Sequence, residues 1–159
     1  MEVHHSKKSR DNTYYMQLAI NLAKKGMTTD GSSGFGAVIV RQNQIIATAF
    51  NTVGSSNDCT QHAELSVIQK AGKTIGYKNL KKCDLYTSCE PCMMCLGACY
   101  WAGFKTIYFG ASAEDAKSFG FIYSNMFYSS SNKDRFQEFK MKQLMRDEAL
   151  EVWRLNKAD

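Results

Sequence analysis

Four of the six cysteines in this 159-residue chain lie within one short segment, residues 89–99. Cys89, Cys92, Cys95 and Cys99 follow the spacing C-x2-C-x2-C-x3-C. A similar spacing surrounds an iron–sulfur cluster in small ferredoxins, where a proline follows the last cysteine. The cysteines could instead bind zinc, form disulfides or pack as small apolar side chains. The choice among these four interpretations depends on a histidine that lies upstream of the cysteines.

That histidine is His62, which forms H-x-E with Glu64, whereas Pro91, Cys92 and Cys95 form P-C-x-x-C. Two cysteines three residues apart at a helix N-terminus place their sulfurs on one face, and the helix dipole favours thiolates there. Together with His62 they would supply three zinc ligands and leave a fourth position for water, as in a catalytic zinc site. Glu64 could then transfer protons to and from that water. The sequence therefore predicts one Zn²⁺ ion per chain and a catalytic Glu64.

The competing interpretations leave more of the pattern unexplained. An iron–sulfur cluster would need Cys89 and Cys99, but Tyr100 stands where the ferredoxin run has proline. A helix that starts at Pro91 would also put Cys89 outside the metal-facing turn. A structural zinc site with four cysteines meets the same difficulty, and a redox C-x-x-C pair assigns no role to His62. The pairing of H-x-E with P-C-x-x-C resembles the signature of zinc nucleobase deaminases.

The other cysteines receive simpler interpretations. Cys59, Cys83 and Cys99 are predicted to be packing residues. Cys89 lies just before the zinc helix, where it could support the metal ligands or belong to the core, and both roles stay open.

Composition and charge narrow the class of protein. Hydrophobic residues make up 44% of the chain and charged residues 22%, which is typical of one globular domain. No stretch approaches the roughly 18 apolar residues of a membrane span. The polar N-terminus lacks the apolar region of a secretory signal, so we expect a cytoplasmic protein with reduced thiols. The net charge of +5 arises partly near the N-terminus and is otherwise interleaved with acids, which does not favour nucleic-acid binding.

Hydrophobic periodicity indicates alternating helices and strands. Helices are predicted over residues 13–26, 61–71, 91–102, 113–118 and 147–155, and strands over 35–41, 45–53, 83–87 and 106–109, with an alternating piece at 139–144. The first two strands form a hairpin around residues 42–44. The polar run 128–135 is predicted to be a surface loop. Strands separated by helices indicate a layered α/β domain with a mixed sheet.

Four segments carry a resemblance to a known family: GFGAVIV (34–40), NTV (51–53), SNDCTQHAE (56–64) and LYTSCEPCMMCLGACYWA (85–102). With them, the chain resembles the cytidine-deaminase-like superfamily, and bacterial-type guanine deaminases in particular, from about Tyr14 to Phe121. The resemblance implies an α/β fold of three layers, with a mixed five-stranded sheet flanked by helices. From its length and its polar N-terminus, the chain is expected to form a single domain over residues 13–159 after a flexible tail, 1–12. The resemblance covers most of this domain. It also implies a homodimer in which residues 128–159 are exchanged between subunits.

The resemblance also implies roles for individual residues. It carries the zinc ligands over to His62, Cys92 and Cys95, and the proton shuttle to Glu64. It places the substrate against Asn51, Phe35 and Trp101. Ala63, beside the ligand His62, and Tyr123 are further candidate substrate-binding residues. For Asn51 a role as a turn residue at the strand end stays open, and so does plain core packing for Phe35 and Trp101.

Three departures from the guanine deaminase pattern bear on the substrate. That pattern has two acids after Gly-Phe, where this chain has Ile122 and Tyr123. A carboxylate there would accept hydrogen bonds from guanine, and a site that leaves ring donors unpaired discriminates against that ring. Cys59 and Gln61 replace a proline and an alanine beside the metal. The C-terminus also lacks the aromatic residue of the family's exchanged segment.

These observations predict a zinc-dependent hydrolase that converts the C–NH2 of a free nucleobase or nucleoside to C=O and releases ammonia. Guanine would fit if Glu114, Asp115 or a C-terminal acid replaced the missing pair; otherwise we expect another aminopurine, cytosine or a related heterocycle. The alternatives are a tRNA adenosine deaminase, which shares both motifs and would act by base flipping, and a non-catalytic zinc protein. The expected partner is a small molecule, with no membrane; a nucleic acid is not favoured but stays open.

Overall fold

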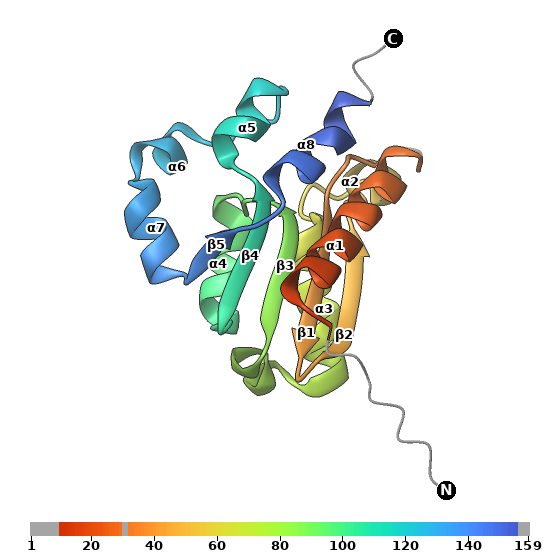
Figure 1. Cartoon of the computed structure of the whole chain (residues 1–159), viewed down its shortest axis with the longest axis vertical. Helices are drawn as coiled ribbons and strands as arrows, with labels where there is room; N and C mark the ends of the chain where they lie inside the picture. Colours follow the sequence, from red (N-terminus) through yellow and green to blue (C-terminus); the bar gives the residue numbers. More distant parts are fainter. Residues whose placement is uncertain (1–9, 30–31, 156–159) are drawn as a thin grey trace, which may run out of the picture.

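The computed structural model describes residues 10–29 and 32–155. A mixed five-stranded sheet in the order β2-β1-β3-β4-β5 forms the middle layer (Figure 1). β1 is antiparallel to β2 and β3, whereas β4 runs parallel to β3 and β5. The strands are β1 (Gly36–Arg41), β2 (Gln44–Phe50), β3 (Asp84–Cys89), β4 (Thr106–Ala111) and β5 (Met141–Gln143). The predicted mixed α/β sheet is confirmed.

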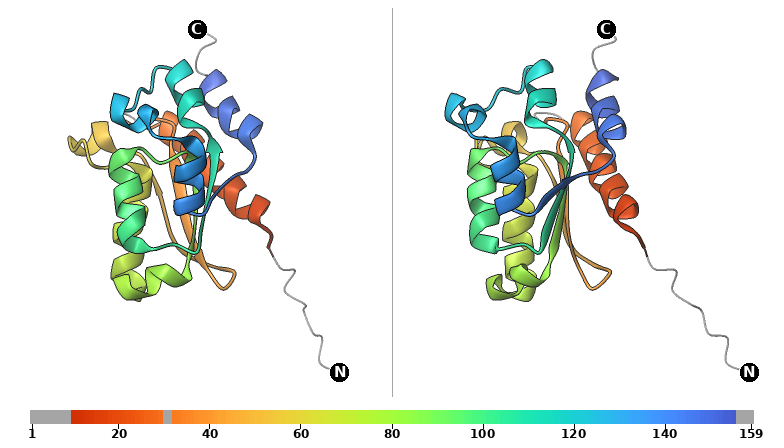
Figure 2. Two further views of the ribbon diagram at one scale, coloured as in Figure 1. Left: turned by 90° about the vertical axis from the view of Figure 1, so that its left-hand side faces the viewer. Right: turned by 60° about the vertical axis from the view of Figure 1, so that its left-hand side comes forward.

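Helices cover both faces of this sheet (Figure 2). α1 (Asn12–Met27) and α8 (Arg146–Arg154) lie on one face, whereas α3 (Ala63–Ile75) and α4 (Met93–Ala102) lie on the other. The shorter helices are α2 (Val53–Ser56), the 3-10 helix η1 (Tyr77–Lys82), α5 (Ala113–Ser118), α6 (Asn125–Ser129) and α7 (Asn132–Glu138). None of the helices in the described part of the chain is long and apolar enough to cross a membrane.

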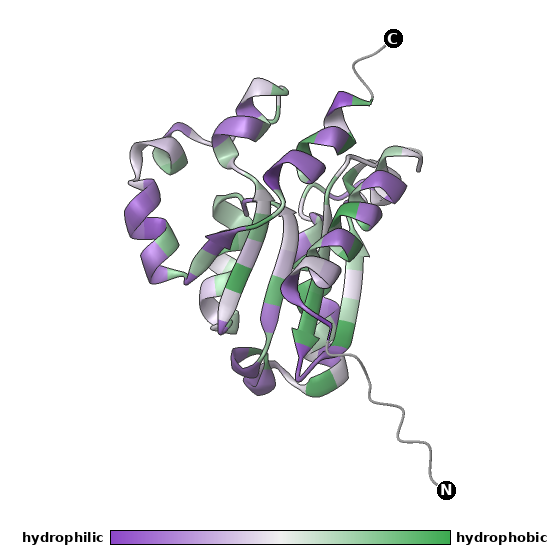
Figure 3. Ribbon diagram, in the orientation of Figure 1, coloured by the Kyte–Doolittle hydropathy of each residue, from purple (hydrophilic) through white to green (hydrophobic). Residues whose placement is uncertain are grey.

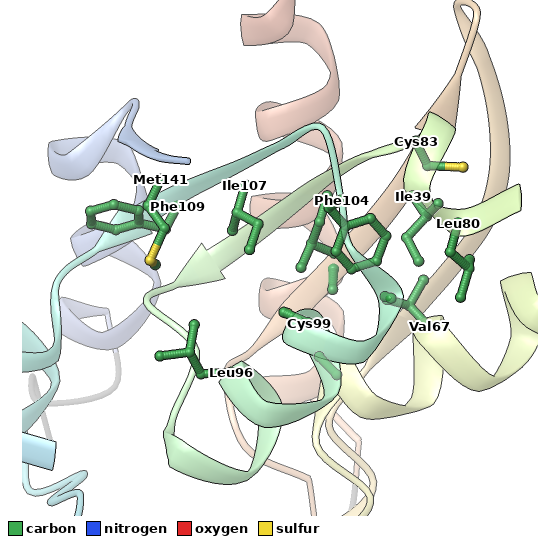
Figure 4. Close-up of a cluster of buried hydrophobic side chains, with 14 of the residues drawn as sticks. Ile39, Val67, Leu80, Cys83, Leu96, Cys99, Phe104, Ile107, Phe109 and Met141 are labelled. Atoms are coloured by element: carbon green, nitrogen blue, oxygen red, sulfur yellow. The ribbon is translucent and has the colours of Figure 1, made fainter. Parts of the chain in front are cut away.

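Each face of the sheet has its own apolar core. Ile39, Val67 and Phe109 belong to the core under α3 and α4, part of which Figure 4 shows. Ile20 and Trp153 belong to the core under α1 and α8. Figure 3 shows the corresponding pattern, with hydrophobic residues along the strands and hydrophilic residues over most of η1 and α7.

Helix α4 begins later than the sequence predicted. Pro91 does not form its first turn, because Cys92 is the N-cap and the helix begins at Met93. The N–H of Glu90 still donates to the carbonyl of Ala111 (2.8 Å), so the chain stays extended beyond the end of β3. Glu90 precedes Pro91, and a residue before proline favours extended backbone. The helix therefore starts only after Pro91, with Cys92 at its N-cap.

The predicted surface loop over residues 128–135 is wrong. The chain forms α6 and α7 here, and the side chains of Ser124 and Ser131 accept hydrogen bonds from the N–H groups of Phe127 and Asp134. Serines of this kind favour helix N-caps as strongly as they favour loops, which explains the error.

Both ends of the chain bear on the predicted domain limits. Of the predicted tail, residues 1–9 lie outside the described part, and Asp11 caps α1 by accepting from the N–H of Tyr14 (3.0 Å). At the other end, α8 packs on α1 and β4 of its own chain. An exchange of residues 128–159 between subunits therefore stays a prediction.

Candidate metal centre and active site

Two helix N-termini meet at the metal centre. His62 is the N-cap of α3 and Cys92 the N-cap of α4, while Cys95 lies in the first turn of α4. The Nδ1 atom of His62 lies 3.5 Å from the Sγ atom of Cys92 and 3.7 Å from that of Cys95. Within residues 10–29 and 32–155, these are the three His, Cys, Asp or Glu side chains that are grouped closely enough for a metal, with ligand atoms within 4.8 Å of one another.

The spacing of these atoms fits a zinc ion. Zinc bonds of about 2.3 Å to sulfur and about 2.0 Å to nitrogen, at a tetrahedral angle, put the two ligand atoms about 3.5 Å apart. The observed separations of 3.5 and 3.7 Å agree with this value. Two thiolates and one imidazole leave one position open, which is the arrangement of catalytic zinc sites. His62, Cys92 and Cys95 are therefore placed to bind one zinc ion, as predicted.

The remaining cysteines do not join this group. The Sγ atom of Cys89 lies 3.2 Å from the hydroxyl of Tyr123, and burial raises the pKa of the Cys89 thiol well above its usual value. Cys83 and Cys99 are buried in the core, as predicted. Cys59 is exposed, so its predicted packing role is wrong; it lies in the loop that connects α2 to α3.

Electrostatic interactions couple the three ligands. A hydrogen bond from the Cys95 thiol, with a further one from His62, lowers the pKa of Cys92 to about 4. The same bond, together with burial, raises the pKa of Cys95. The hydrogen bond with Cys92 raises the pKa of His62 despite the opposing effect of desolvation. A bound divalent cation deprotonates coordinating thiols, so it would remove this shared proton.

Glu64 lies in the first turn of α3, two residues after the metal ligand His62. Its side chain lines the same cavity as His62 and Cys92 although the residue is only 5% exposed. The Oε1 atom lies 3.0 Å from the hydroxyl of Thr87 on β3. Burial, followed by the negative charge of Cys92, raises the pKa of Glu64.

A cavity of about 320 Å³ opens beside the metal centre, near the lower end of the volume range of small-molecule sites. The Oδ1 atom of Asn51 accepts from the N–H of Val53 (3.1 Å), so the NH2 group of this amide is left as a donor for a ligand. The cavity is lined by Ser33, Phe35, Asn51, Val53, His62, Glu64, Cys92, Phe121, Ile122 and Tyr123.

Two of the predicted substrate residues do not line this cavity. Trp101 is 85% exposed in the last turn of α4, and its ring contacts that of Tyr100. Cys92 caps the opposite end of this 10-residue helix, roughly 15 Å away at 1.5 Å per residue. Ala63 is buried in the core under α3. Trp101 and Ala63 are close in sequence to metal ligands, but Trp101 lies at the other end of its helix and Ala63 faces the core. Closeness in sequence therefore did not bring their side chains to the cavity.

The sequence did not assign Ser33, Val53 or Phe121 to the cavity, although Ser33 precedes one of the segments that carried the resemblance, Val53 ends another, and Phe121 precedes Ile122. Ile122 and Tyr123 stand where guanine deaminases have acids. The hydroxyl of Tyr123 donates to the carbonyl of Glu90 (2.5 Å), and burial raises the pKa of this phenol well above its usual value.

Of the acids considered as substitutes, neither Glu114 nor Asp115 lines the cavity. Glu114 is exposed on α5. The carboxylate of Asp115 bonds to Arg146 and to the N–H of Ser112 (2.9 Å), and these bonds occupy both of its oxygens.

Residues 9–111 match the family described as the cytidine and deoxycytidylate deaminase zinc-binding region. The chain belongs to this family, whose members are zinc-dependent hydrolytic enzymes that act on the C–N bonds of nucleobases or nucleosides.

Among individual proteins, the chain is 48% identical to the guanine deaminase of Bacillus subtilis over 107 residues, which cover 67% of this chain and 69% of that one. It is 34% identical to a tRNA-specific adenosine deaminase of Buchnera aphidicola over 145 residues, 91% of this chain and 93% of the other. A crystal structure of the Bacillus subtilis guanine deaminase superposes with a TM-score of 0.71 at 37% identity, covering 82% of this chain and 92% of that chain.

Proposed function

We propose that the protein hydrolyses the C–NH2 group of a free nucleobase or a related ring to C=O and releases ammonia. The observation that carries this proposal is the lining of the cavity, which combines two of the metal ligands, His62 and Cys92, with Glu64 and with the side chains of Asn51, Phe35 and Phe121. The volume of about 320 Å³ suits a small ring.

The residues of the chain have separate tasks in this reaction. Zinc, when bound, supplies a nucleophile by lowering the pKa of a water to about 7. Glu64 takes a proton on the carboxylate oxygen that is not bonded to Thr87, and transfers protons to the ring nitrogen and the departing amine. Thr87 holds the other oxygen. The NH2 group of Asn51 donates to an acceptor on the substrate ring, and the Phe35 side chain packs against the substrate ring.

The substrate is expected to be a ring with few donors on the side facing Ile122 and Tyr123. The Ile122 side chain has no acceptor, and the Tyr123 hydroxyl, which donates to the carbonyl of Glu90 and lies 3.2 Å from the Cys89 sulfur, offers one neutral oxygen in place of a carboxylate. A buried donor without a partner costs about 1–3 kcal/mol, so the N–H groups of guanine would bind poorly here. The similarity to the Bacillus subtilis guanine deaminase therefore supports the chemistry of the site more strongly than it supports guanine itself.

The experiment that tests this function is a screen of ammonia release with guanine, guanosine, adenine, cytosine, cytidine, aminotriazines and aminopteridines. We expect turnover of at least one free ring and a low rate with guanine. Replacing Ile122→Asp should raise guanine turnover, whereas Ile122→Thr, which adds no charge, should not. A wild-type preference for guanine would contradict the substrate proposal, and no turnover of any ring would contradict the function.

One observation favours a second function. The similarity to the Buchnera aphidicola tRNA-specific adenosine deaminase extends over 91% of this chain, further than the match to guanine deaminase. If the protein edits tRNA, inosine should form in a tRNA transcript, and the affinity for tRNA should fall steeply with salt.

We also propose that the protein is a cytoplasmic homodimer. The exposed side of α4 carries large apolar side chains, a composition typical of interaction surfaces: Met93, Met94, Tyr100 and Trp101. Light scattering should give twice the chain mass, and Trp101→Glu should give the monomer. A monomeric wild-type protein would contradict this assembly.

A further inference from the structure

Glu90 lies two residues before the zinc ligand Cys92. Its backbone N–H, its backbone carbonyl and both of its carboxylate oxygens form hydrogen bonds. The residue is 2% exposed. Its backbone and both carboxylate oxygens take part in hydrogen bonds with the carbonyl of Ala111 (2.8 Å), the hydroxyl of Tyr123 (2.5 Å), the N–H of Ala113 (2.8 Å) and the guanidinium of Arg135 (3.2 Å). The backbone that enters the metal centre is therefore fixed from several elements at once.

Arg135 is the charged partner in this network and comes from α7. It is 7% exposed, and its guanidinium stands 4.2 Å from the centre of the Phe127 ring. Its Nη1 atom donates to the carbonyl of Phe127 (3.2 Å) and to the carbonyl of Ser130 (2.8 Å), while Nη2 donates to Asn132 and Glu90. One side chain thus connects the turn between α6 and α7 to the loop that carries Cys92.

A buried ion pair such as Glu90–Arg135 is not an effective way to stabilise a fold. Removing two charges from water costs free energy that their attraction repays only when the geometry is good, and apolar residues of similar size often stabilise a fold as well. A hydrogen-bonded pair does, however, fix the position of the segment that carries it. Here that segment continues through Pro91, whose ring restrains the backbone, into the N-cap Cys92.

We propose that Glu90 and Arg135 position the metal centre by holding residues 90–92, so that the Cys92 sulfur stands at bonding distance from zinc. They act through the Cys92 loop and touch neither the metal nor the substrate. Arg135 lies outside residues 9–111, the part of the chain that matches the deaminase family. The proposal concerns the affinity for zinc, so it does not depend on which ring is the substrate.

The test measures zinc affinity in purified, folded protein by competition with a chromogenic chelator. Arg135→Met alone leaves the Glu90 carboxylate buried without a charged partner. The main variant is therefore the double change Glu90→Gln and Arg135→Met, in which the oxygen of the introduced amide can still accept from the N–H of Ala113. Groups that orient metal ligands typically change metal affinity by roughly 10- to 100-fold, and we expect a loss in this range. The absorption spectrum of the Co²⁺-substituted protein should shift as well, because the position of a thiolate ligand changes.

Two further variants separate positioning from a general loss of stability. Arg135→Lys keeps the positive charge beside Glu90 but cannot donate to all of the same acceptors, and it should weaken zinc binding by roughly 3- to 10-fold. Arg146→Met removes an exposed pair with Asp115 and should leave zinc affinity unchanged. Wild-type zinc affinity in either folded variant of the Glu90–Arg135 pair would overturn the proposal, as would an equal loss in Arg146→Met.

Discussion

The part of the chain through β4 and the part that follows it place their functional groups in different ways. In the first part, His62, Glu64, Cys92 and Cys95 all lie at or near the beginning of a helix, within two short motifs. In the second part, side chains reach back to the first part from far along the sequence. The chemistry of the site is thus built locally, whereas its position and shape depend on distant contacts.

Trp153 on α8 illustrates the second kind of contact. It is 4% exposed, and its Nε1 atom donates to the carbonyl of Gly34 (2.9 Å). Its ring lies 5.4 Å from that of Phe35 and 5.2 Å from that of Phe121. Both phenylalanines line the cavity, so the C-terminal helix supports the cavity walls from behind. The difference between the two parts can be tested. Substitutions in the part through β4 should abolish the reaction, whereas substitutions in the part after β4 should change the binding of substrate or metal.

Removal of zinc should have the largest effect. Dialysis against a chelator is expected to lower ammonia release to background, because the site then lacks its activated water, and added Zn²⁺ should restore the rate. Metal content and ammonia release would be measured on the same samples. A metal-free protein that keeps its activity would contradict the local chemistry described for the first part.

Glu64→Gln should come next. The amide keeps the size of the side chain but cannot carry the proton, so we expect turnover to fall at least ~100-fold while zinc content stays unchanged. Glu114→Gln, a change in an exposed acid of α5, is the matched control and should be silent. Comparable turnover in the two variants would remove Glu64 from the mechanism.

Trp153→Phe should have an intermediate effect that distinguishes the second part from the first. It leaves the buried carbonyl of Gly34 without its partner, which should lower the free energy of unfolding by about 1–3 kcal/mol. We expect KM to rise more than kcat falls, because the walls shift while the metal centre stays. Leu150→Val on the same helix supplies a stability control of about 1 kcal/mol. A lower kcat with unchanged KM would show that α8 acts on the chemistry instead.

The exposed pair of Arg146 and Asp115 should have the smallest effect. The hydrogen bond from Arg146 lowers the pKa of Asp115 below its usual 3.8, so the pair stabilises the folded state above that pH and loses its effect as the pH falls through the lowered value. Because Arg146 is half exposed and its ion pair is screened by water, Arg146→Met should lower the free energy of unfolding only slightly at neutral pH. Denaturant titrations of both proteins at about pH 7 and at successively lower pH check this, because the difference should shrink as Asp115 becomes protonated. A difference that does not change with pH would show that Arg146 acts through packing.

The sequence by itself determined the metal chemistry and the fold class. The zinc ligands could be predicted because each lies in a short motif whose local structure, a helix N-terminus, depends on nearby residues. The alternation of helices and strands likewise depends on local periodicity, which is why the mixed sheet was predicted correctly and helix limits were wrong by only a few residues.

Only the tertiary structure decided which side chains support the cavity. Nothing near Arg135 in the sequence shows that its charge is neutralised by Glu90, and nothing near Trp153 shows that its ring backs Phe35 and Phe121. The same reason explains why Trp101, one motif residue among many, proved to be exposed. A periodic pattern shows that one face of a helix is buried, but the partner of that face is set by the packing of elements distant in the chain.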